Sequence, residues 1–310
     1  MIMHRSDQAQ AISALKNAAP YIRMYKGKTF VVKAGGGVFA EAAATRNLVE
    51  QIAILHYFGV RVVLVHGGGP QLTELSAALG VPTRMVEGRR ITDERSIDVT
   101  AMVLNGLINT RLLAICRDLN IDAVGLSGVD AALVRAHRRP PTPADNGELI
   151  DFGFVGDIDG VDTTVLNKLL DNALMPVVSP LSADESGTLL NINADTVAAA
   201  LGAALGAEKL ILCTGAPGIL GNLADAGSLI SYTDLQGLRR LREEGRIAAG
   251  MLPKVKAIEE AIRGGVRRVH VISYQSPEGI LAEVFTNEGT GTMIVADVNA
   301  LPLAEQHGPS

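Results

Sequence analysis

Aliphatic runs alternate with longer helical patterns along the whole chain, and this alternation restricts the possible folds more than any other feature. The runs TFVVK at 29–33, RVVLV at 61–65 and KLILCT at 209–214 consist mainly of β-branched and aliphatic residues. Strands of this kind are buried on both faces of a sheet, whereas the segments at 44–58 and 94–118 have helical spacing. We therefore expect an α/β protein in which a mostly parallel sheet lies between layers of helices.

The same patterns predict the remaining elements. We expect further helices at 7–25, 71–79, 163–173, 196–207, 233–245, 253–265 and 277–286, and further strands at 122–128, 132–138, 175–180, 267–273 and 291–296. Pro20 should kink or break the first helix because proline lacks a backbone N–H. The glycine-punctuated stretch at 147–161 predicts a hairpin, and the polar stretch at 181–190 predicts a hinge between two domains.

Composition excludes several classes of function. The chain has 310 residues, of which 47% are hydrophobic, and this favours about two domains with large cores. The net charge of −5 argues against a nucleic-acid partner. Cys116 and Cys213 form no spaced motif, which favours a reducing compartment. Residues 1–10 lack the apolar core of a signal peptide, and the apolar stretch at 197–207 is too short to span a membrane. We therefore expect a cytoplasmic protein without a membrane partner.

Three glycine-rich segments directly follow expected strands. They are Gly35–Gly37, Gly67–Gly69 and GAPG at 215–218. Ligands of open parallel sheets bind at the carboxyl ends of the strands, where backbone N–H groups of such loops can hold phosphates. Lys33 precedes the first loop and would point its ammonium group at the same place; the alternative is a snorkelling lysine beside an ordinary turn. Together the loops favour a phosphate-handling enzyme.

Two common nucleotide motifs do not account for these loops. The string G-x-x-x-x-G-K-[ST] of a P-loop does not occur in the chain. A dinucleotide fingerprint is formally present at Gly35, Gly37 and Ala40, but the second strand ends in Val65 and His66 rather than in an acidic residue. We therefore do not expect NAD to be the ligand.

Several longer segments carry a resemblance to a known family. They are PYIRMYKGKTFVVKAGG, VVLVHGGGPQL, EGRRITD, VGLSG, FGFVGDI, NINADTVAAALGAALGAEKLIL, PGIL, AGMLPKV and EVFTNEGTGTMIV. On these segments the chain resembles the N-acetylglutamate kinases of the amino acid kinase family, and in particular their arginine-sensitive type with an N-terminal helix. The resemblance implies an open three-layer αβα sandwich with two lobes. It also implies phosphorylation of the side-chain carboxylate of N-acetyl-L-glutamate by ATP, the second step of arginine biosynthesis.

The resemblance also implies a division of the chain. Residues 1–26 would be an oligomerisation helix, residues 27–188 a lobe that binds the acylated amino acid, and residues 189–310 a lobe that binds the nucleotide and arginine. The expected assembly is a homo-oligomer, either a hexamer built as a trimer of dimers or a dimer.

Three residues match the catalytic positions of the family. Lys33 would contact the transferring phosphoryl group, Lys254 the ATP side, and Asp195 would hold both lysines in place. This agrees with the chemistry, because a carboxylate needs no general base and the difficulty is charge repulsion between two anions. Taken by themselves, Asp195 could be a helix N-cap and Lys254 a surface lysine.

The remaining implied contacts concern substrate, phosphate and metal. Arg90 matches the arginine that binds a substrate carboxylate through a bidentate fork, whereas its neighbour Arg89 reads as a solvated charge. The further substrate-binding residues are Gly68, Gly69 and Asn191, and the phosphate-binding backbone groups are those of Gly35, Gly36 and Gly67. Mg²⁺ is expected with ATP, held mainly by phosphates and water, so no protein metal ligands are expected.

An arginine site is implied near the end of the chain. Glu283 would pair with the guanidinium of the inhibitor L-arginine, and the loop at Gly289 and Gly291 would offer backbone carbonyls. His270 matches a further contact, and Tyr21 would close the site from the N-terminal helix.

Three residues depart from the family pattern. Ala34 replaces a larger residue and could open room beside the substrate, Val129 replaces a lysine, and Gly215 replaces an acid of the nucleotide loop. Two alternatives therefore stay open: a kinase acting on N-succinylglutamate or carrier-bound aminoadipate, and a non-catalytic regulatory homologue. Retention of both Lys33 and Lys254 favours a working kinase.

Overall fold

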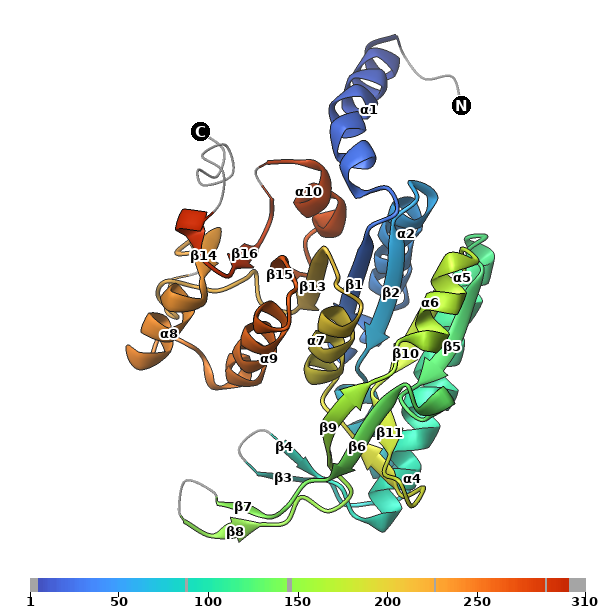
Figure 1. Ribbon diagram of the computed structural model, residues 1–310, viewed down its shortest axis with the longest axis vertical. Coiled ribbons are helices and arrows are strands. Elements are labelled where there is room, and N and C mark those ends of the chain that lie inside the picture. The colour runs from blue at the N-terminus through green and yellow to red at the C-terminus, as the bar shows by residue number, and fades with distance from the viewer. Residues whose placement is uncertain (1–4, 87–88, 144–146, 226, 288, 301–310) are drawn as a thin grey trace.

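A computed structural model of the chain describes residues 5–86, 89–143, 147–225, 227–287 and 289–300. Its centre is an eight-stranded sheet (Figure 1). In spatial order the strands are β14 (Tyr232–Asp234), β16 (Thr292–Val295), β15 (Arg268–Ser273), β13 (Lys209–Thr214), β1 (Thr29–Ala34), β2 (Arg61–His66), β10 (Met175–Ser179) and β5 (Ala123–Ser127).

The sheet is mostly parallel, as the sequence predicts. The six strands from β15 to β5 run parallel to one another, while β16 is antiparallel to β15 and carries β14 parallel to itself. Residues before and after the expected lobe boundary share this sheet, because β1 pairs with β13 on one side and β2 on the other.

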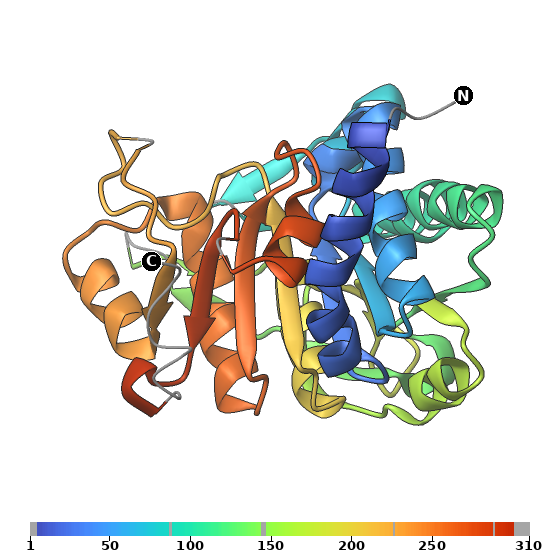
Figure 2. The ribbon, with the colours of Figure 1, turned by 90° about the horizontal axis from the view of Figure 1, so that it is seen from above.

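Helices cover both faces of the sheet and complete a three-layer sandwich (Figures 1 and 2). One face carries α2 (Ala42–Tyr57), α3 (Gly69–Ala78), α4 (Glu94–Ala101), α5 (Thr110–Asp118) and α10 (Gly279–Phe285). The other carries α6 (Thr164–Asp171), α7 (Ala194–Ala204), α8 (Leu235–Glu243) and α9 (Leu252–Arg263). Alternate residues of β1 point to opposite faces, so Phe30 and Val32 enter one core and Val31 the other. The predicted α/β sandwich is thereby confirmed.

Smaller elements are attached at the end of the molecule opposite α1 in the view of Figure 1. A four-stranded sheet contains β12 (Leu189–Asn191), β11 (Leu181–Ala183), β6 (Val134–Arg138) and β9 (Gly156–Val161), and two hairpins pair β3 (Arg84–Val86) with β4 (Arg89–Ile91) and β7 (Thr142–Pro143) with β8 (Leu149–Ile150). The short helices are η1 (Gly36–Ala40), η3 (Asp130–Ala132), η4 (Ala249–Met251) and η5 (Val298–Ala300).

Two local expectations need correction. Helix α1 (Arg5–Tyr25) continues through Pro20, so the predicted break is wrong. The stretch 147–161 does not pair with itself, because its strands β8 and β9 pair with β7 and β6 from the preceding segment. The stretch 181–190 contains the antiparallel strands β11 and β12, and the hinge expected there stays a prediction.

The long helix expected at 94–118 is continuous, but its middle, η2 (Met102–Asn109), has π-helical hydrogen bonding. By length and apolar composition this helix could cross a membrane. In the fold it instead packs Val103, Leu104, Ile108 and Leu112 into the core on its face of the sheet.

Candidate active site

The two glycine loops after β1 and β2 lie against each other because their strands are neighbours in the sheet. A methyl group added at Gly36 would lie 2.6 Å from Pro70 Cδ and 2.9 Å from the Gly69 nitrogen. The Gln71 side chain donates a 2.9 Å hydrogen bond to the Gly36 carbonyl and ties the loops together. Position 36 therefore requires glycine for a close approach of two backbones.

The loops contain both occupied and open backbone donors. The Gly35 N–H donates to the Cys213 carbonyl and the Gly67 N–H to the Ala34 carbonyl, so the phosphate-binding role expected for these two groups does not fit this arrangement. The N–H groups of Gly36, Gly68 and Gly69 make no hydrogen bond within the described part of the chain. These three are left to bind an anion.

Two lysines share one buried carboxylate beside these loops. The Lys33 ammonium lies 2.6 Å from Asp195 Oδ1, and the Lys254 ammonium lies 2.7 Å from Asp195 Oδ2. Lys33 comes from the end of β1, Asp195 from the first turn of α7, and Lys254 from the first turn of α9. The structure thus brings together three residues that are spread over more than 200 positions of the sequence.

The alternative roles considered for Asp195 and Lys254 do not hold. Asn193 is the N-cap of α7, since its side-chain oxygen accepts from the N–H groups of Asp195 and Thr196. Asp195 is 3% exposed, and the Lys254 side chain, 20% exposed, is held by it. A carboxylate in the first turn is also stabilised by the helix dipole.

Burial and charge shift the pKa values of this group in definite directions. Burial lowers the pKa of Lys33; the Asp195 carboxylate opposes that shift, and the Lys254 ammonium adds to it. Burial alone would raise the pKa of Asp195, but Lys33 and Lys254 together hold it below its ordinary value. The two lysines thus favour the ionised form of the buried Asp195 carboxylate that lies between them.

Arg90 and Asn191 approach the loops from the smaller sheets. Arg90 on β4 donates to the Gly69 carbonyl at 3.3 Å and to the hydroxyls of Thr73 and Thr83 at 2.7 and 3.0 Å. It forms no ion pair with a described residue, and partial burial lowers its pKa. The neighbouring Arg89 is exposed, as expected. Arg90 is thus a partly buried guanidinium with no carboxylate partner within the described chain.

Asn191 lies next to the same region. Its side-chain amide donates to the hydroxyl of the buried Thr92 at 3.3 Å, two residues after Arg90. The predicted substrate residues Gly68, Gly69, Arg90 and Asn191 therefore lie near one another beyond the carboxyl end of β2, and their roles stay predictions.

The three departures from the family pattern are placed differently. Ala34 is fully buried in the core, so its side chain opens no room beside a ligand. Val129 is 41% exposed. A methyl group at Gly215 would lie 3.6 Å from the Tyr274 ring, and one at Gly37 only 2.8 Å from the Tyr274 hydroxyl. Tyr274 thus stands between two of the glycine loops, a position that its place just after a strand could have suggested.

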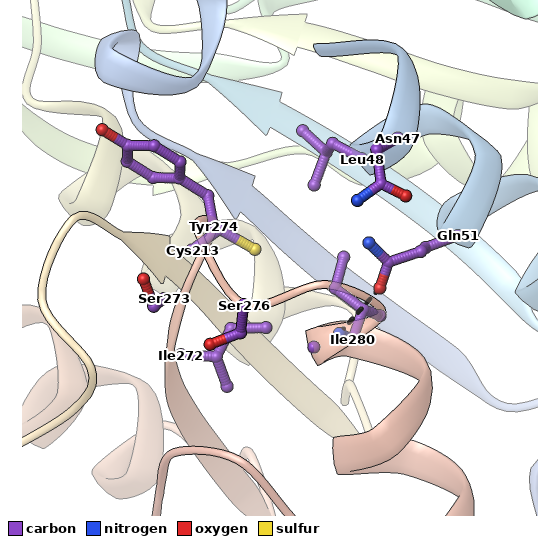
Figure 3. A pocket seen from close by; sticks show the side chains of 10 residues that line it. Asn47, Leu48, Gln51, Cys213, Ile272, Ser273, Tyr274, Ser276 and Ile280 are labelled. Atoms are coloured by element: carbon purple, nitrogen blue, oxygen red, sulfur yellow. Dashed lines mark hydrogen bonds between the residues drawn. The ribbon is translucent and has the colours of Figure 1, made fainter. Parts of the chain in front are cut away.

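A shallow hollow adjoins the site behind Cys213 and Tyr274 (Figure 3). Its empty volume, open solvent included, is about 240 Å³. Gln51 closes it by accepting the Ile280 N–H at 2.9 Å, which fixes the start of α10 against α2. None of the residues predicted to bind substrate or phosphate lines this hollow.

Two further residues near the loops were missed by sequence reasoning. His66 and Asn109 are buried, and their side chains lie 3.2 Å apart between His66 Nε2 and Asn109 Nδ2. Burial lowers the pKa of His66 to about 4, so its ring is neutral at neutral pH. The histidine directly before the Gly67–Gly69 loop was the signal that could have identified it.

The residues expected to form an arginine site also come together. His270 Nδ1 lies 2.7 Å from Glu283 Oε1, and Tyr21 on α1 donates to Asn287 just after α10. Figure 2 shows α1 lying alongside α10. Glu283 forms one cluster with His270, Gly289 and Gly291, whereas Tyr21 makes its contact with the segment just after α10.

Burial, neighbouring charges and hydrogen bonds shift the pKa values of His270 and Glu283. Burial and the nearby Lys209 ammonium lower the pKa of His270 to about 4. Although burial opposes it, hydrogen bonds from His270 and from the Thr290 and Gly291 N–H groups lower the pKa of Glu283 to about 2. The loop at 289–291 therefore directs N–H groups towards Glu283, whereas backbone carbonyls were expected there.

Comparisons with known proteins agree with the motifs. Residues 28–273 match the amino acid kinase family. The acetylglutamate kinase of Myxococcus xanthus is 47% identical over 290 residues, which are 92% of this chain and 94% of that protein. The acetylglutamate kinase of Archaeoglobus fulgidus is 40% identical over 285 residues, which are 91% of this chain and 98% of that protein.

Solved structures agree as well. The N-acetylglutamate synthase of Neisseria gonorrhoeae has a TM-score of 0.80 at 29% identity, over 92% of this chain and 63% of that longer one. A carbamate kinase of Giardia lamblia shares the fold, with a TM-score of 0.61 at 18% identity over 87% of this chain and 99% of that one. The resemblance to N-acetylglutamate kinases is confirmed, and the chain belongs to the amino acid kinase family.

Proposed function

We propose that this protein transfers the γ-phosphoryl group of ATP to the side-chain carboxylate of N-acetyl-L-glutamate, the second step of arginine biosynthesis. The observation that carries the proposal is the buried arrangement of Lys33, Asp195 and Lys254 beside two glycine loops with open N–H donors. Relatives that match nine tenths of the chain are named acetylglutamate kinase, which supports the same activity.

The reaction needs no proton transfer. A carboxylate oxygen of the substrate forms a bond to the γ-phosphorus while the bond from that phosphorus to the β,γ-bridging oxygen breaks. The products are ADP and an acylphosphate. Because the nucleophile is already an anion, catalysis rests on positioning and on stabilising negative charge.

The residues divide this work between the two anions. Lys33 faces the transferring phosphoryl group, Lys254 stabilises charge on the nucleotide side, and Asp195 fixes the distance between them. The open N–H groups of Gly36, Gly68 and Gly69 bind phosphoryl or carboxylate oxygens. Fixed donors in a water-poor site stabilise a transition state more than mobile water does.

Arg90 and Asn191 hold the acylated amino acid. The Arg90 guanidinium binds a substrate carboxylate through its fork of N–H donors. It is available for this role because no described carboxylate forms an ion pair with it. We further propose the division suggested by the motifs, with residues 27–188 supplying this substrate side and residues 189–310 the nucleotide side.

Mg²⁺ accompanies the nucleotide in this proposal. The described residues contain no group of three or more His, Cys, Asp or Glu side chains that could hold a metal ion. Both Asp195 oxygens lie against lysine ammonium groups. These residues do not fit a resident metal site, so the ion would be held by ATP phosphates and water.

We also propose that L-arginine binds at the cluster of Tyr21, His270, Glu283, Gly289 and Gly291 and inhibits the enzyme. The cluster offers an ionised Glu283 for the guanidinium, although that carboxylate already accepts three hydrogen bonds. The Neisseria gonorrhoeae synthase, whose amino acid kinase fold resembles this chain, has been solved with L-arginine. L-arginine bound between α1 and α10 can inhibit only if its affinity differs between two conformations of the enzyme.

The expected assembly involves α1. Its residues Ile12 and Leu15, about one turn apart, are each more than half exposed, which is typical of a face that packs against a second copy. We propose a hexamer, a trimer of dimers joined through α1, with a dimer as the alternative. A cytoplasmic location stays a prediction.

Substrate choice is tested by measuring ADP release with N-acetylglutamate, N-succinylglutamate and glutamate at equal concentrations. We expect the highest kcat/KM for N-acetylglutamate. A higher value for N-succinylglutamate would move the assignment to a related acylamino-acid kinase, and ADP release with none of them would remove it.

A further inference from the structure

The Gly67–Gly69 loop is held in place from behind by a buried chain of polar contacts. His66 Nδ1 lies 3.2 Å from the Gly67 carbonyl, His66 Nε2 lies 3.2 Å from Asn109 Nδ2, and that same amide nitrogen lies 2.9 Å from the Val177 carbonyl. The chain runs from β10 through η2 to the loop. The sequence patterns did not predict these contacts of His66 and Asn109.

The contacts fix the direction of every hydrogen bond. A backbone carbonyl only accepts, so the Asn109 group facing Val177 must be the amide nitrogen. Its second hydrogen then points to His66 Nε2, which must accept. A neutral imidazole that accepts at Nε2 carries its proton on Nδ1, and this proton is donated to the Gly67 carbonyl.

The Gly67 carbonyl and the Gly68 N–H belong to one planar trans peptide and point in opposite directions. Holding the carbonyl towards His66 therefore aims the Gly68 N–H away from it. This N–H has no partner within the described part of the chain. The orientation of an open anion donor is thus set by a histidine behind the loop.

The π-helical segment η2 completes this support. A methyl group at Gly68 would lie 2.5 Å from Ile108 Cδ1 and 2.8 Å from Leu104 Cδ2, so η2 covers the loop with apolar side chains. Ser179 Oγ lies 2.5 Å from Asn105 Oδ1, which gives η2 a second polar contact with β10. Wide π turns occur frequently at functional sites.

Space for the Asn109 amide is made by a glycine on β5. A methyl group at Gly125 would lie 2.1 Å from Asn109 Oδ1 and 2.9 Å from Leu113 Cδ1. Gly125 belongs to the VGLSG segment of the sequence. The requirement for glycine there follows from the position of Asn109.

We propose that His66 and Asn109 are positioning residues that hold the Gly67–Gly68 peptide so that the Gly68 N–H is presented to the anion in the active site. The inference rests on the proposed kinase function for its kinetic consequence. Its structural content, a His66 ring protonated on Nδ1, is independent of which substrate is used.

The test compares two replacements of His66 that keep different ring contacts. In His66→Asn the new amide nitrogen lies near the position of Nδ1 and can still donate to the Gly67 carbonyl. In His66→Gln the longer side chain extends towards Asn109, and the hydrogen bond to the Gly67 carbonyl is lost. We expect His66→Gln to lower kcat at least about tenfold, since loss of one such donor costs about 10²–10³. His66→Asn should stay within about threefold of the wild type, with the KM for ATP little changed in both.

Two further measurements separate positioning from stability. Cys116→Ala, a buried change on α5 two turns beyond Asn109, should lower thermal stability without changing kcat. Nitrogen NMR of histidine-labelled wild type, with His66→Asn to assign the signal, should show the proton on Nδ1 of His66. A proton on Nε2, or equal losses of kcat in His66→Asn and His66→Gln, would overturn the proposal. A wild type that forms no acylphosphate would remove the kinase assignment, while the NMR result would still decide the orientation of the ring.

Discussion

Replacing Asp195 with asparagine tests the buried charge cluster directly. Asparagine has nearly the same shape as aspartate, but the change leaves the Lys33 and Lys254 ammonium groups without their shared counterion. Asp195 is 3% exposed and Lys33 is 5% exposed, so water cannot replace the lost charge. Breaking a buried ion pair on one side costs about 3–5 kcal/mol. A domain with a typical free energy of unfolding of about 5–15 kcal/mol should still fold, with a clear loss measurable by urea titration.

The stability deficit of Asp195→Asn should depend on pH in a definite direction. Without Asp195 the pKa of Lys33 falls further below its ordinary value, because burial and Lys254 are no longer opposed. The unfolded chain then binds more protons than the folded one, so stability increases as pH rises towards 10.5. The difference in the free energy of unfolding between Asp195→Asn and the wild type should therefore become smaller at alkaline pH.

The same change should reduce catalysis more than binding. Lys33 would no longer be held against the phosphoryl group, and loss of one such stabilising group lowers kcat by about 10²–10³. Acylphosphate trapped with hydroxylamine measures this loss at saturating substrates. The reasoning would be refuted by an Asp195→Asn enzyme with wild-type kcat and wild-type stability.

A surface pair provides the matched control. Asp171 lies 2.8 Å from Arg61 on the outside of the molecule, where its side chain is 64% exposed. Asp171→Asn should change the free energy of unfolding by less than about 1 kcal/mol, and kcat not at all. An equal loss of free energy of unfolding in Asp195→Asn and Asp171→Asn would show that burial does not strengthen the contribution of the Asp195 cluster.

Three further outcomes are expected. Arg90→Lys keeps the charge but loses the planar fork, so steady-state kinetics should show KM for the acylated amino acid raised about tenfold with kcat little changed, and Arg89→Lys should show neither effect. The pKa of His66 is about 4 in the folded protein, so the unfolded chain binds the extra proton between pH 6.5 and 4, and His66 contributes about 3 kcal/mol to the loss of stability over that range. His270 has a similarly lowered pKa and contributes a comparable loss, so in urea titrations at each pH His66→Asn should lose about 3 kcal/mol less than the wild type, whereas the exposed His137→Asn should lose as much as the wild type. Deleting residues 1–25 should leave active dimers that no longer respond to L-arginine, and a full-length protein that is dimeric by light scattering and indifferent to arginine would contradict the proposed regulation.

The sequence predicts the layers of the fold from local patterns, and the family motifs single out three residues that lie together in the structure, whose catalytic roles stay a proposal. Buried parallel strands such as β1 and β13 contain aliphatic runs, and the neighbouring positions of β1 and β2 place their glycine loops together. The family motifs contain Lys33, Asp195 and Lys254, and in the structure each lysine ammonium lies within 2.7 Å of an Asp195 carboxylate oxygen. Here local and tertiary preferences agree.

The misses concern pairings that local sequence does not encode. The stretch 147–161 alternates like a hairpin, but its partners β6 and β7 precede it in the chain, and register between distant strands cannot be read from one of them. Pro20 does not end α1, whose Tyr25 is packed in the core while Tyr21 contacts the segment after α10. The π turns of η2 and the contacts of Asn109 depend on β5 and β10, and no periodicity of the helix itself reveals them.

Hydroxylamine trapping of the product tests the central claim most directly. Wild-type protein with ATP, Mg²⁺ and N-acetyl-L-glutamate should yield one equivalent of hydroxamate for each ADP released, and Lys33→Ala should lower the rate about 10²–10³-fold. Omission of ATP or of the amino acid supplies the blank. No hydroxamate from the wild type at saturating substrates, or an undiminished rate in Lys33→Ala, would contradict phosphoryl transfer at the Lys33–Asp195–Lys254 cluster.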